Sequence, residues 1–216
     1  MDIEVIKITV GPISENCYIV KTGEGKAALI DPGAEGERIS AELEKHGLSP
    51  EKILLTHGHF DHIGAAAFLK EKYHIPVYIS EKDECMLNDG EKSGAVIAPF
   101  MEFNPVAADY TFKDGDEIEI GDLKAVVLET PGHSAGSVCF IIGDCIFAGD
   151  TIFRGSAGRT DLYSGDFREQ EKSLEKLSKL KGSFRLYCGH GADSTLDEEK
   201  QFNPYLAACG NSGIRI

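Results

Sequence analysis

A cluster of side chains with the chemistry of metal ligands lies near residue 60. His57, His59, Asp61 and His62 fall within six positions, directly after the apolar run 53–55. Imidazole nitrogen and carboxylate oxygen are ligands that suit zinc, iron or manganese. Loops at the carboxyl ends of strands in open α/β layers are where such sites form. The sequence therefore predicts a metal site at the end of a strand.

Three more candidate ligands, His133, Asp150 and His190, each follow an apolar stretch with the pattern of a strand. The chain has seven histidines, and His46 and His74 close predicted helices, where a cation suits the helix dipole. One shared metal site explains the five histidines at strand ends better than five separate accidents would. We therefore predict that seven residues converge on one centre: His57, His59, Asp61, His62, His133, Asp150 and His190.

Hydrophobic patterning predicts the elements that must position these residues, because apolar residues alternate in some runs and recur at helical spacing in others. In the first half, strands are predicted at 3–10, 16–20, 26–30, 52–55 and 77–79, and helices at 35–46, 64–73 and 81–87. In the second half, strands are predicted at 118–120, 123–128, 138–142, 145–148 and 184–188. Helices there are predicted to start at Asp166 and Thr195, each of which opens a capping-box pattern.

The two halves of the chain carry a weak internal echo. The segment 55–59, which reads Leu-Thr-His-Gly-His, resembles 129–133, which reads Glu-Thr-Pro-Gly-His, and both follow an apolar strand. The echo predicts two similar β/α halves that face one site. Asp31 ends another strand, and we interpret it as a turn former that supports the site without binding a metal.

Residues 88–114 have no clear period and contain two prolines, Pro99 and Pro105. Long irregular segments in compact domains are either functional or disordered. We predict that this segment forms a wall or lid of the pocket.

Length and charge restrict the class of protein. A chain of 216 residues can bury a core of its own, and we predict one domain over 1–216. A formal net charge of -14 argues against nucleic acid or an anionic membrane as the main partner, which leaves a small molecule. No apolar run approaches membrane-spanning length, and residues 1–4 lack the basic start of a secretory signal, so we expect a cytoplasmic protein. The sequence does not indicate an oligomeric state.

Six cysteines occur without a C-x-x-C pair, and we interpret each as a reduced, buried, small hydrophobic residue. They are Cys17, Cys85, Cys139, Cys145, Cys188 and Cys209. Cys188 is the one whose position suggests more, because it lies two residues before His190.

The motif T-H-G-H-F-D-H-I-G at 56–64 resembles that of the metallo-β-lactamase superfamily. Gly-His at 132–133, Gly-Asp at 149–150 and Gly-His at 189–190 extend the resemblance along nearly the whole chain. The resemblance implies a four-layer αββα sandwich with the site at one edge of two facing sheets. It also implies two divalent metal ions, most simply zinc, with iron or manganese as alternatives. One ion would be held by His57, His59 and His133, a second by Asp61, His62 and His190, and Asp150 would bridge them.

Two further segments resemble the small glyoxalase II-like branch of that superfamily, which also includes persulfide dioxygenases. The first is Gly158-Arg159-Thr160-Asp161, which follows Phe153-Arg154-Gly155. The second is 199–205, which reads Glu-Lys-Gln-Phe-Asn-Pro-Tyr. The resemblance implies a hydrolase of the hydroxyacylglutathione type.

The function that we expect is hydrolysis of a small acyl thioester. A water that bridges two metals loses a proton near neutral pH and becomes the nucleophile, and the metals polarise the carbonyl. A thiolate leaves easily, so this bond needs little general-acid help. Asp61 could orient the water as a catalytic residue, and Arg154 and Arg159 are candidates to bind an anionic substrate tail.

Four alternatives remain open at this point. A persulfide dioxygenase would use one ferrous iron on His57, His133 and Asp150 and shares the visible motif. A lactonase or a β-lactamase is less favoured, the latter because it would usually need an export signal. A structural metal module competes only if protein closes the site, and seven ligands across two metals leave coordination positions open.

Overall fold

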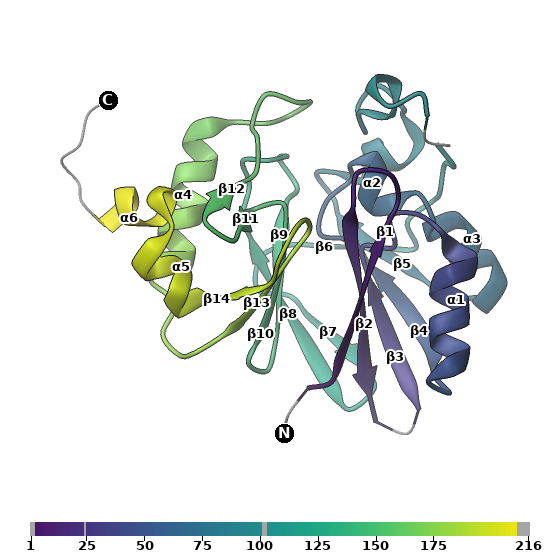
Figure 1. The fold of residues 1–216 in the computed structure, drawn as a ribbon. Coiled ribbons are helices and arrows are strands. Elements are labelled where there is room, and N and C mark those ends of the chain that lie inside the picture. Colours follow the sequence, from purple (N-terminus) through teal and green to yellow (C-terminus); the bar gives the residue numbers. More distant parts are fainter. Residues whose placement is uncertain (1–2, 24, 101–102, 211–216) are drawn as a thin grey trace.

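The computed structural model describes residues 3–23, 25–100 and 103–210. The first half of the chain forms one six-stranded sheet in sequential order, in which β1 to β3 are antiparallel and β3 to β6 are parallel. Its strands are β1 (Val5–Val10), β2 (Glu15–Thr22), β3 (Lys26–Ile30), β4 (Ser49–Leu54), β5 (Val77–Ser80) and β6 (Tyr110–Phe112). Helices α1 (Gly36–Lys45) and α3 (Ala66–Tyr73) connect its parallel strands and cover its outer face (Figure 1).

The second half forms a second six-stranded sheet, in the order β14-β13-β10-β9-β8-β7, in which only β10 and β13 run parallel. Its strands are β7 (Glu117–Ile120), β8 (Leu123–Glu129), β9 (Val138–Ile142), β10 (Cys145–Gly149), β13 (Arg185–Cys188) and β14 (Ser194–Thr195). A separate ribbon joins β11 (Ile152–Phe153) and β12 (Ser156–Ala157). Helices α4 (Phe167–Ser178), α5 (Leu196–Phe202) and α6 (Pro204–Gly210) lie outside this sheet (Figure 1).

The two sheets face each other, so the predicted four-layer αββα sandwich is confirmed. Buried residues of both sheets form one central cluster, in which Tyr18 packs edge-on against Phe147. Two further apolar clusters lie between each sheet and its own helices. One domain over 1–216 stays a prediction. No helix of the described ranges has both the length and the apolar character needed to cross a membrane.

Most predicted elements are present, and the capping predictions are confirmed. The Asp166 side chain accepts hydrogen bonds from the backbone N–H groups of Arg168 and Glu169, and Thr195 accepts one from Glu198. These bonds satisfy donors that have no partner inside the helix. His46 and His74 occupy the C-terminal caps of α1 and α3, as we expected.

Other elements differ from the predictions. The helix predicted at 64–73 begins later, as α3 at Ala66, and a short helix that was not predicted, α2 (Phe60–Ile63), precedes it. Between them, Gly64 packs so closely on the Gly33 carbonyl that a Cβ would lie 2.3 Å from its oxygen. The helix predicted at 81–87 is a short 3₁₀ turn, η1 (Glu84–Asn88). Residues 88–114, predicted to be irregular, contain η2 (Ala95–Ile97) and β6.

The cysteine interpretation is wrong at one position. Cys17, Cys139, Cys145 and Cys188 are buried, whereas Cys85 is exposed. The side chain of Cys209 lies outside the described part. Burial raises the pKa of Cys188 to about 12, so this thiol is an inert core group despite its place near His190.

Gly33, in the loop after β3, packs tightly against the backbone of Asp61 in α2, and this contact predicts an effect of mutation on stability. A Cβ at Gly33 would lie 1.6 Å from the Asp61 carbonyl oxygen, so we expect Gly33→Ala to destabilise the metal-free protein by about 3 kcal/mol or more. Gly47→Ala is the matched control, because Gly47 has a φ of +63° and no atom within 4 Å, and should cost about 1 kcal/mol. Urea unfolding measures both, and equal losses would contradict this explanation.

Candidate metal centre

The loops after β4 and β8 bring three histidines together. His57 and His59 follow β4, and His133 follows β8 in the opposite sheet. One nitrogen from each lies within 4.8 Å of the other two, and His59 Nδ1 is 2.8 Å from His133 Nε2. We call these residues the first triad. The predicted first ligand set is thus assembled in space.

A second triad consists of Asp61, His62 and His190. Asp61 and His62 belong to α2, and His190 follows β13. His190 Nε2 lies 3.1 Å from Asp61 Oδ2, and His62 Nε2 lies 3.5 Å from the same oxygen. As in the first triad, each half of the chain contributes ligand atoms.

Asp150 lies between the triads, in the turn after β10. Its Oδ1 is 3.3 Å from His62 Nε2, and its Oδ2 is 3.4 Å from His133 Nε2 and 3.7 Å from His190 Nε2. Gly189 permits this approach, because a Cβ there would lie 2.2 Å from Asp150 Oδ1 and 2.7 Å from His62 Cε1. The structure therefore brings together all seven predicted ligands, with Asp150 placed to contact both triads.

The donor set fits divalent cations. Nε2 of His57 and Nε2 of His62 are buried and make no hydrogen bond within the described residues. A buried polar atom without a partner is unfavourable, and an ion is one of the few groups that can satisfy several at once. Imidazole and carboxylate at this density suit zinc, iron or manganese.

Asp31 supports the site from behind, as the sequence analysis proposed. Its Oδ1 accepts a hydrogen bond from the Thr56 backbone at 2.7 Å, and its Oδ2 accepts one from Thr56 Oγ1 at 2.6 Å. Oδ2 also lies 3.0 Å from His62 Nδ1, which leaves Nε2 of that ring for the centre. Asp31 is also close enough to His57 and His62 to form a further possible ligand group, and both of its oxygens are hydrogen-bonded. Such partners fix the orientation of ligating histidines.

Asp83 is a supporting residue that the sequence reasoning missed. This buried carboxylate accepts hydrogen bonds from the backbone of Gly58 at 3.1 Å, from the backbone of Gly136 at 2.8 Å and from Ser134 Oγ at 2.6 Å. It therefore ties the loop after β4 to the loop that carries His133. The charged run 81–84 has the pattern of a solvated helix face, so this role of Asp83 was not recognisable from the sequence.

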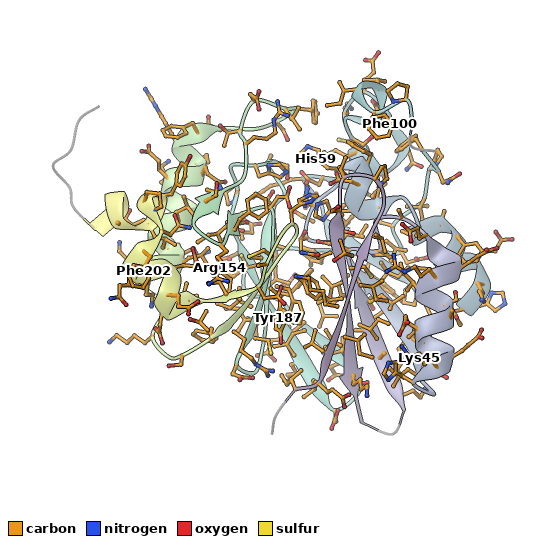
Figure 2. All side chains as sticks on the ribbon, in the orientation of Figure 1. Lys45, His59, Phe100, Arg154, Tyr187 and Phe202 are labelled. Carbon is orange, nitrogen blue, oxygen red and sulfur yellow. The ribbon has the colours of Figure 1, made fainter. Side chains whose placement is uncertain are left out.

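The two arginines predicted to bind substrate occupy different settings. The Arg159 carbonyl lies 2.7 Å from His133 Nδ1 and fixes that ring, whereas the exposed Arg159 guanidinium pairs with Asp161 at 2.6 and 2.8 Å. Arg154 is exposed and lies toward the C-terminal helices, well apart from His59 in Figure 2. A substrate-binding role for either residue stays a prediction.

The segment 88–100 packs beside α2 at the mouth of the cluster. The Ser93 carbonyl accepts a hydrogen bond from the Phe60 backbone at 3.0 Å, next to His59. Val96, Ile97 and Phe100 are exposed, and Figure 2 shows Phe100 at the same end of the molecule as His59. This position suits the predicted wall of the pocket. The predicted wall or lid extends over 88–114 and so includes residues 101 and 102, which lie outside the described part.

Burial and mutual repulsion keep His57 and His59 of the first triad free of protons. Burial, followed by the neighbouring histidines, holds the pKa of His57 well below its usual value and lowers the pKa of His59 to about 3. Both imidazoles are therefore neutral near pH 7, the form that binds metals.

The second triad has the opposite tendency. Burial lowers the pKa of His62, but the carboxylates of Asp61 and Asp150 outweigh it and raise the pKa well above its usual value. Burial also lowers the pKa of His190, but its hydrogen bond to Asp61 and the charges of Asp150 and Asp61 together outweigh burial and raise it. Burial raises the pKa of Asp61 and Asp150, but the charge of His62, together with hydrogen bonds and the charge of His190, outweighs burial and lowers both pKa values. Without a metal, the two histidines of this triad therefore bind protons more tightly than a free imidazole does.

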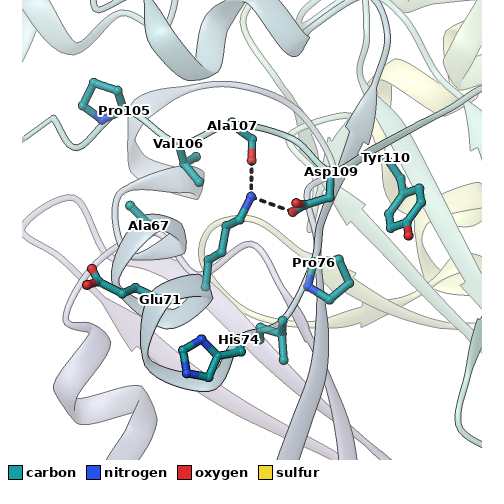
Figure 3. Close-up of a pocket in the computed structure, with 11 residues that line it drawn as sticks. Ala67, Glu71, His74, Pro76, Pro105, Val106, Ala107, Asp109 and Tyr110 are labelled. Carbon is teal, nitrogen blue, oxygen red and sulfur yellow. Dashed lines mark hydrogen bonds and ion pairs between the residues drawn. The ribbon is translucent and has the colours of Figure 1, made fainter.

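A separate pocket of about 680 Å³ lies between α3 and the segment that precedes β6 (Figure 3). Its lining cation, Lys70, is already engaged, with Nζ 2.8 Å from the Ala107 carbonyl oxygen and 2.7 Å from Asp109 Oδ2. None of the 11 residues that line it belongs to either triad. Its chemistry is thus poorer than that of the histidine cluster, which we take as the functional site.

Two facing mixed sheets with a His/Asp cluster at their common edge define a metal-binding α/β fold. The chain belongs to the metallo-beta-lactamase superfamily, whose family model matches residues 10–190. The site and the family together indicate an enzyme, most simply a metal-dependent hydrolase.

Individual relatives extend over almost the whole chain. The probable metallo-hydrolase YqgX of Bacillus subtilis is 36% identical over 203 residues, which cover 93% of this chain and 96% of the relative. The hydroxyacylglutathione hydrolase GloC of Haemophilus influenzae is 33% identical over 210 residues, which cover 95% and 98%.

Solved structures show the same fold. The BLEG-1 B3 metallo-beta-lactamase superposes with a TM-score of 0.88 at 34% identity, over 94% of this chain and 99% of the other. TTHA1623, crystallised in a di-iron-bound form, superposes with a TM-score of 0.82 at 38% identity, over 93% and 100%.

Acidification should remove ions from the second triad before the first. A raised pKa means that protons compete for His62 and His190 already at higher pH, whereas His57 and His59, with lowered pKa values, stay unprotonated to lower pH. Zinc content per chain, measured after dialysis at successively lower pH, should therefore fall in two steps. His190→Ala should lack the step at higher pH and His59→Ala the step at lower pH. The reverse assignment would contradict this order.

Proposed function

We propose that the protein is a metal-dependent thioesterase that hydrolyses a small acyl thioester of the hydroxyacylglutathione type. The observation that carries the proposal is the convergence of seven His and Asp side chains from both halves as two triads joined by Asp150. The Haemophilus relative, which bears the name of a hydroxyacylglutathione hydrolase, supports this substrate class.

The proposed ligand sets follow the two triads. The first triad would hold one divalent ion, the second triad would hold another, and Asp150 would be a ligand of both. Zinc is the ion that we propose, and the di-iron form of TTHA1623 supports iron as the alternative. Two bound divalent ions would supply an activated water and stabilise negative charge on a carbonyl oxygen.

The residues of the chain prepare the reaction in three ways. Asp61 Oδ2, fixed by His190 at 3.1 Å, is a hydrogen-bond acceptor that orients the attacking water. Asp31 and the Arg159 carbonyl fix the rings of His62 and His133, so little reorganisation is needed when the substrate binds. A thiolate is a good leaving group, so the site needs no dedicated acid.

The net charge and the free cysteine thiols support a small-molecule substrate and a cytoplasmic location. The formal net charge of -14 favours a small-molecule substrate over nucleic acid or an anionic membrane. Five cysteines of the described part are free thiols, which suits a reducing compartment such as the cytoplasm.

Asp61→Asn tests the role of the water-orienting carboxylate. The change preserves size but removes the charge, so kcat on S-lactoylglutathione should fall by about 100-fold or more. Asp197→Asn, at an exposed carboxylate on α5, is the control and should retain full turnover. Zinc content of each sample separates loss of the ion from loss of orientation. Full turnover by Asp61→Asn would contradict the assignment, and a wild-type protein without turnover on any thioester would exclude the substrate class.

Metal analysis separates the hydrolase from the persulfide dioxygenase. We expect two divalent ions per chain and no oxygen uptake on glutathione persulfide. One iron per chain, with oxygen uptake, would favour the dioxygenase instead. Two more substrates test the remaining enzymatic alternatives. Turnover of nitrocefin would indicate a β-lactamase, an alternative that the fold shared with BLEG-1 suggests. Turnover of a simple lactone would indicate a lactonase.

A further inference from the structure

Glu15 is a buried carboxylate that the proposed reaction does not use. It begins β2, is 1% exposed, and neither of its carboxylate oxygens makes a hydrogen bond within the described residues. An isolated carboxylate is very unfavourable in such a place unless a positive charge compensates it. An ionised Glu15 therefore calls for a cationic neighbour, because burial raises the pKa of this group and otherwise favours its protonated form.

The neighbour of Glu15 is the second triad. Glu15 Oε1 lies 3.7 Å from His62 Nδ1, on the same nitrogen that Asp31 contacts at 3.0 Å. The backbone of Glu15 also forms an isolated β-bridge with His190. Two of the three residues of this triad thus adjoin Glu15.

The opposite edge of the His62 ring faces two further carboxylates. Its Nε2 lies 3.3 Å from Asp150 and 3.5 Å from Asp61. Four carboxylates therefore surround one imidazole, and a single protonated ring cannot balance them. Two divalent ions carry four positive charges, and the four carboxylates carry four negative charges when all are ionised.

We propose that Glu15 is a positioning residue for the second metal ion, one that increases the zinc affinity of the second triad by supplying negative charge behind His62. The inference rests on the proposed function only in its claim that two ions bind, and it does not depend on the substrate. Glu15 adjoins His62, which belongs to the second triad. Because Coulomb energy falls with distance, Glu15 should increase zinc affinity most at the second triad.

Glu15→Gln tests the proposal, because it keeps the shape of the side chain and removes its charge. Zinc titration of the metal-free variant by calorimetry should show a Kd for the second ion that is about tenfold higher or more, with the first nearly unchanged. The thermal midpoint of the metal-free variant should be no lower than that of the wild type, because a buried uncompensated carboxylate is gone. The rise in midpoint on zinc addition should be smaller. Glu15→Asp keeps the charge and should retain most of that rise.

Glu199→Gln is the matched control. Glu199 is also a buried carboxylate, at 3% exposure, but it accepts hydrogen bonds from the Gly155 backbone at 2.8 Å and from Asn203 at 2.8 Å. Its removal should lower the metal-free midpoint and leave both zinc affinities unchanged. The two variants are thus expected to show opposite patterns.

Several outcomes would overturn the proposal. They are an unchanged second Kd in Glu15→Gln, a Glu15→Asp variant as weak as Glu15→Gln, or a metal-free Glu15→Gln that is less stable or does not fold. The wild-type assay keeps the two proposals separate. Two bound zinc ions without thioester turnover would exclude the proposed substrate and leave the role of Glu15 intact, whereas wild-type zinc affinity in Glu15→Gln would exclude that role whatever the turnover.

Discussion

Carboxylates are buried close to one another and to imidazoles at the site, and the surrounding structure must accommodate their charges. Asp61 is buried, Asp150 is nearly so, and Asp31 stands behind them without access to water. Repulsion among carboxylates and among histidines is strong in such surroundings. Two hydrogen bonds stabilise the Asp31 carboxylate, one from the Thr56 backbone N–H and one from Thr56 Oγ1. The other two carboxylates, of Asp61 and Asp150, lie where they can bind cations.

The two sheets allow this concentration of charge by meeting at their strand ends. The Thr56 carbonyl accepts a hydrogen bond from Val138 at 2.9 Å, and Asn16 donates to the Gly189 carbonyl at 2.8 Å, so the halves are joined at the site itself. Small residues permit the close contact, since a Cβ at Gly149 would lie 2.2 Å from Thr56 Oγ1. The apolar core positions the sheets, and these few polar bonds then align the loops.

The candidate metal ligands could be predicted from the sequence better than the residues that support them. His133 and His190 could be recognised because each follows an apolar strand and the cluster at 57–62 already indicated a metal site that needs further ligands. Glu15 and Asp83 could not, because a glutamate at the start of a strand and an aspartate in a charged run are usually exposed. Long strands and capped helices were predictable from periodicity. Elements of two or three residues, such as β6 and β14, are too short to show a period and form only because neighbouring strands pair with them.

The division of each triad between the halves has a mechanical consequence. His57 and His59 come from the first sheet and His133 from the second, so an ion held by all three would act as a cross-link between distant parts of the chain. The second triad would add another such link through His190. The bound ions would then make the interface between the sheets more rigid. Neither half expressed as a separate fragment would contain a complete set of ligands. Reassembly of two such fragments would be driven by the ion as well as by the apolar core.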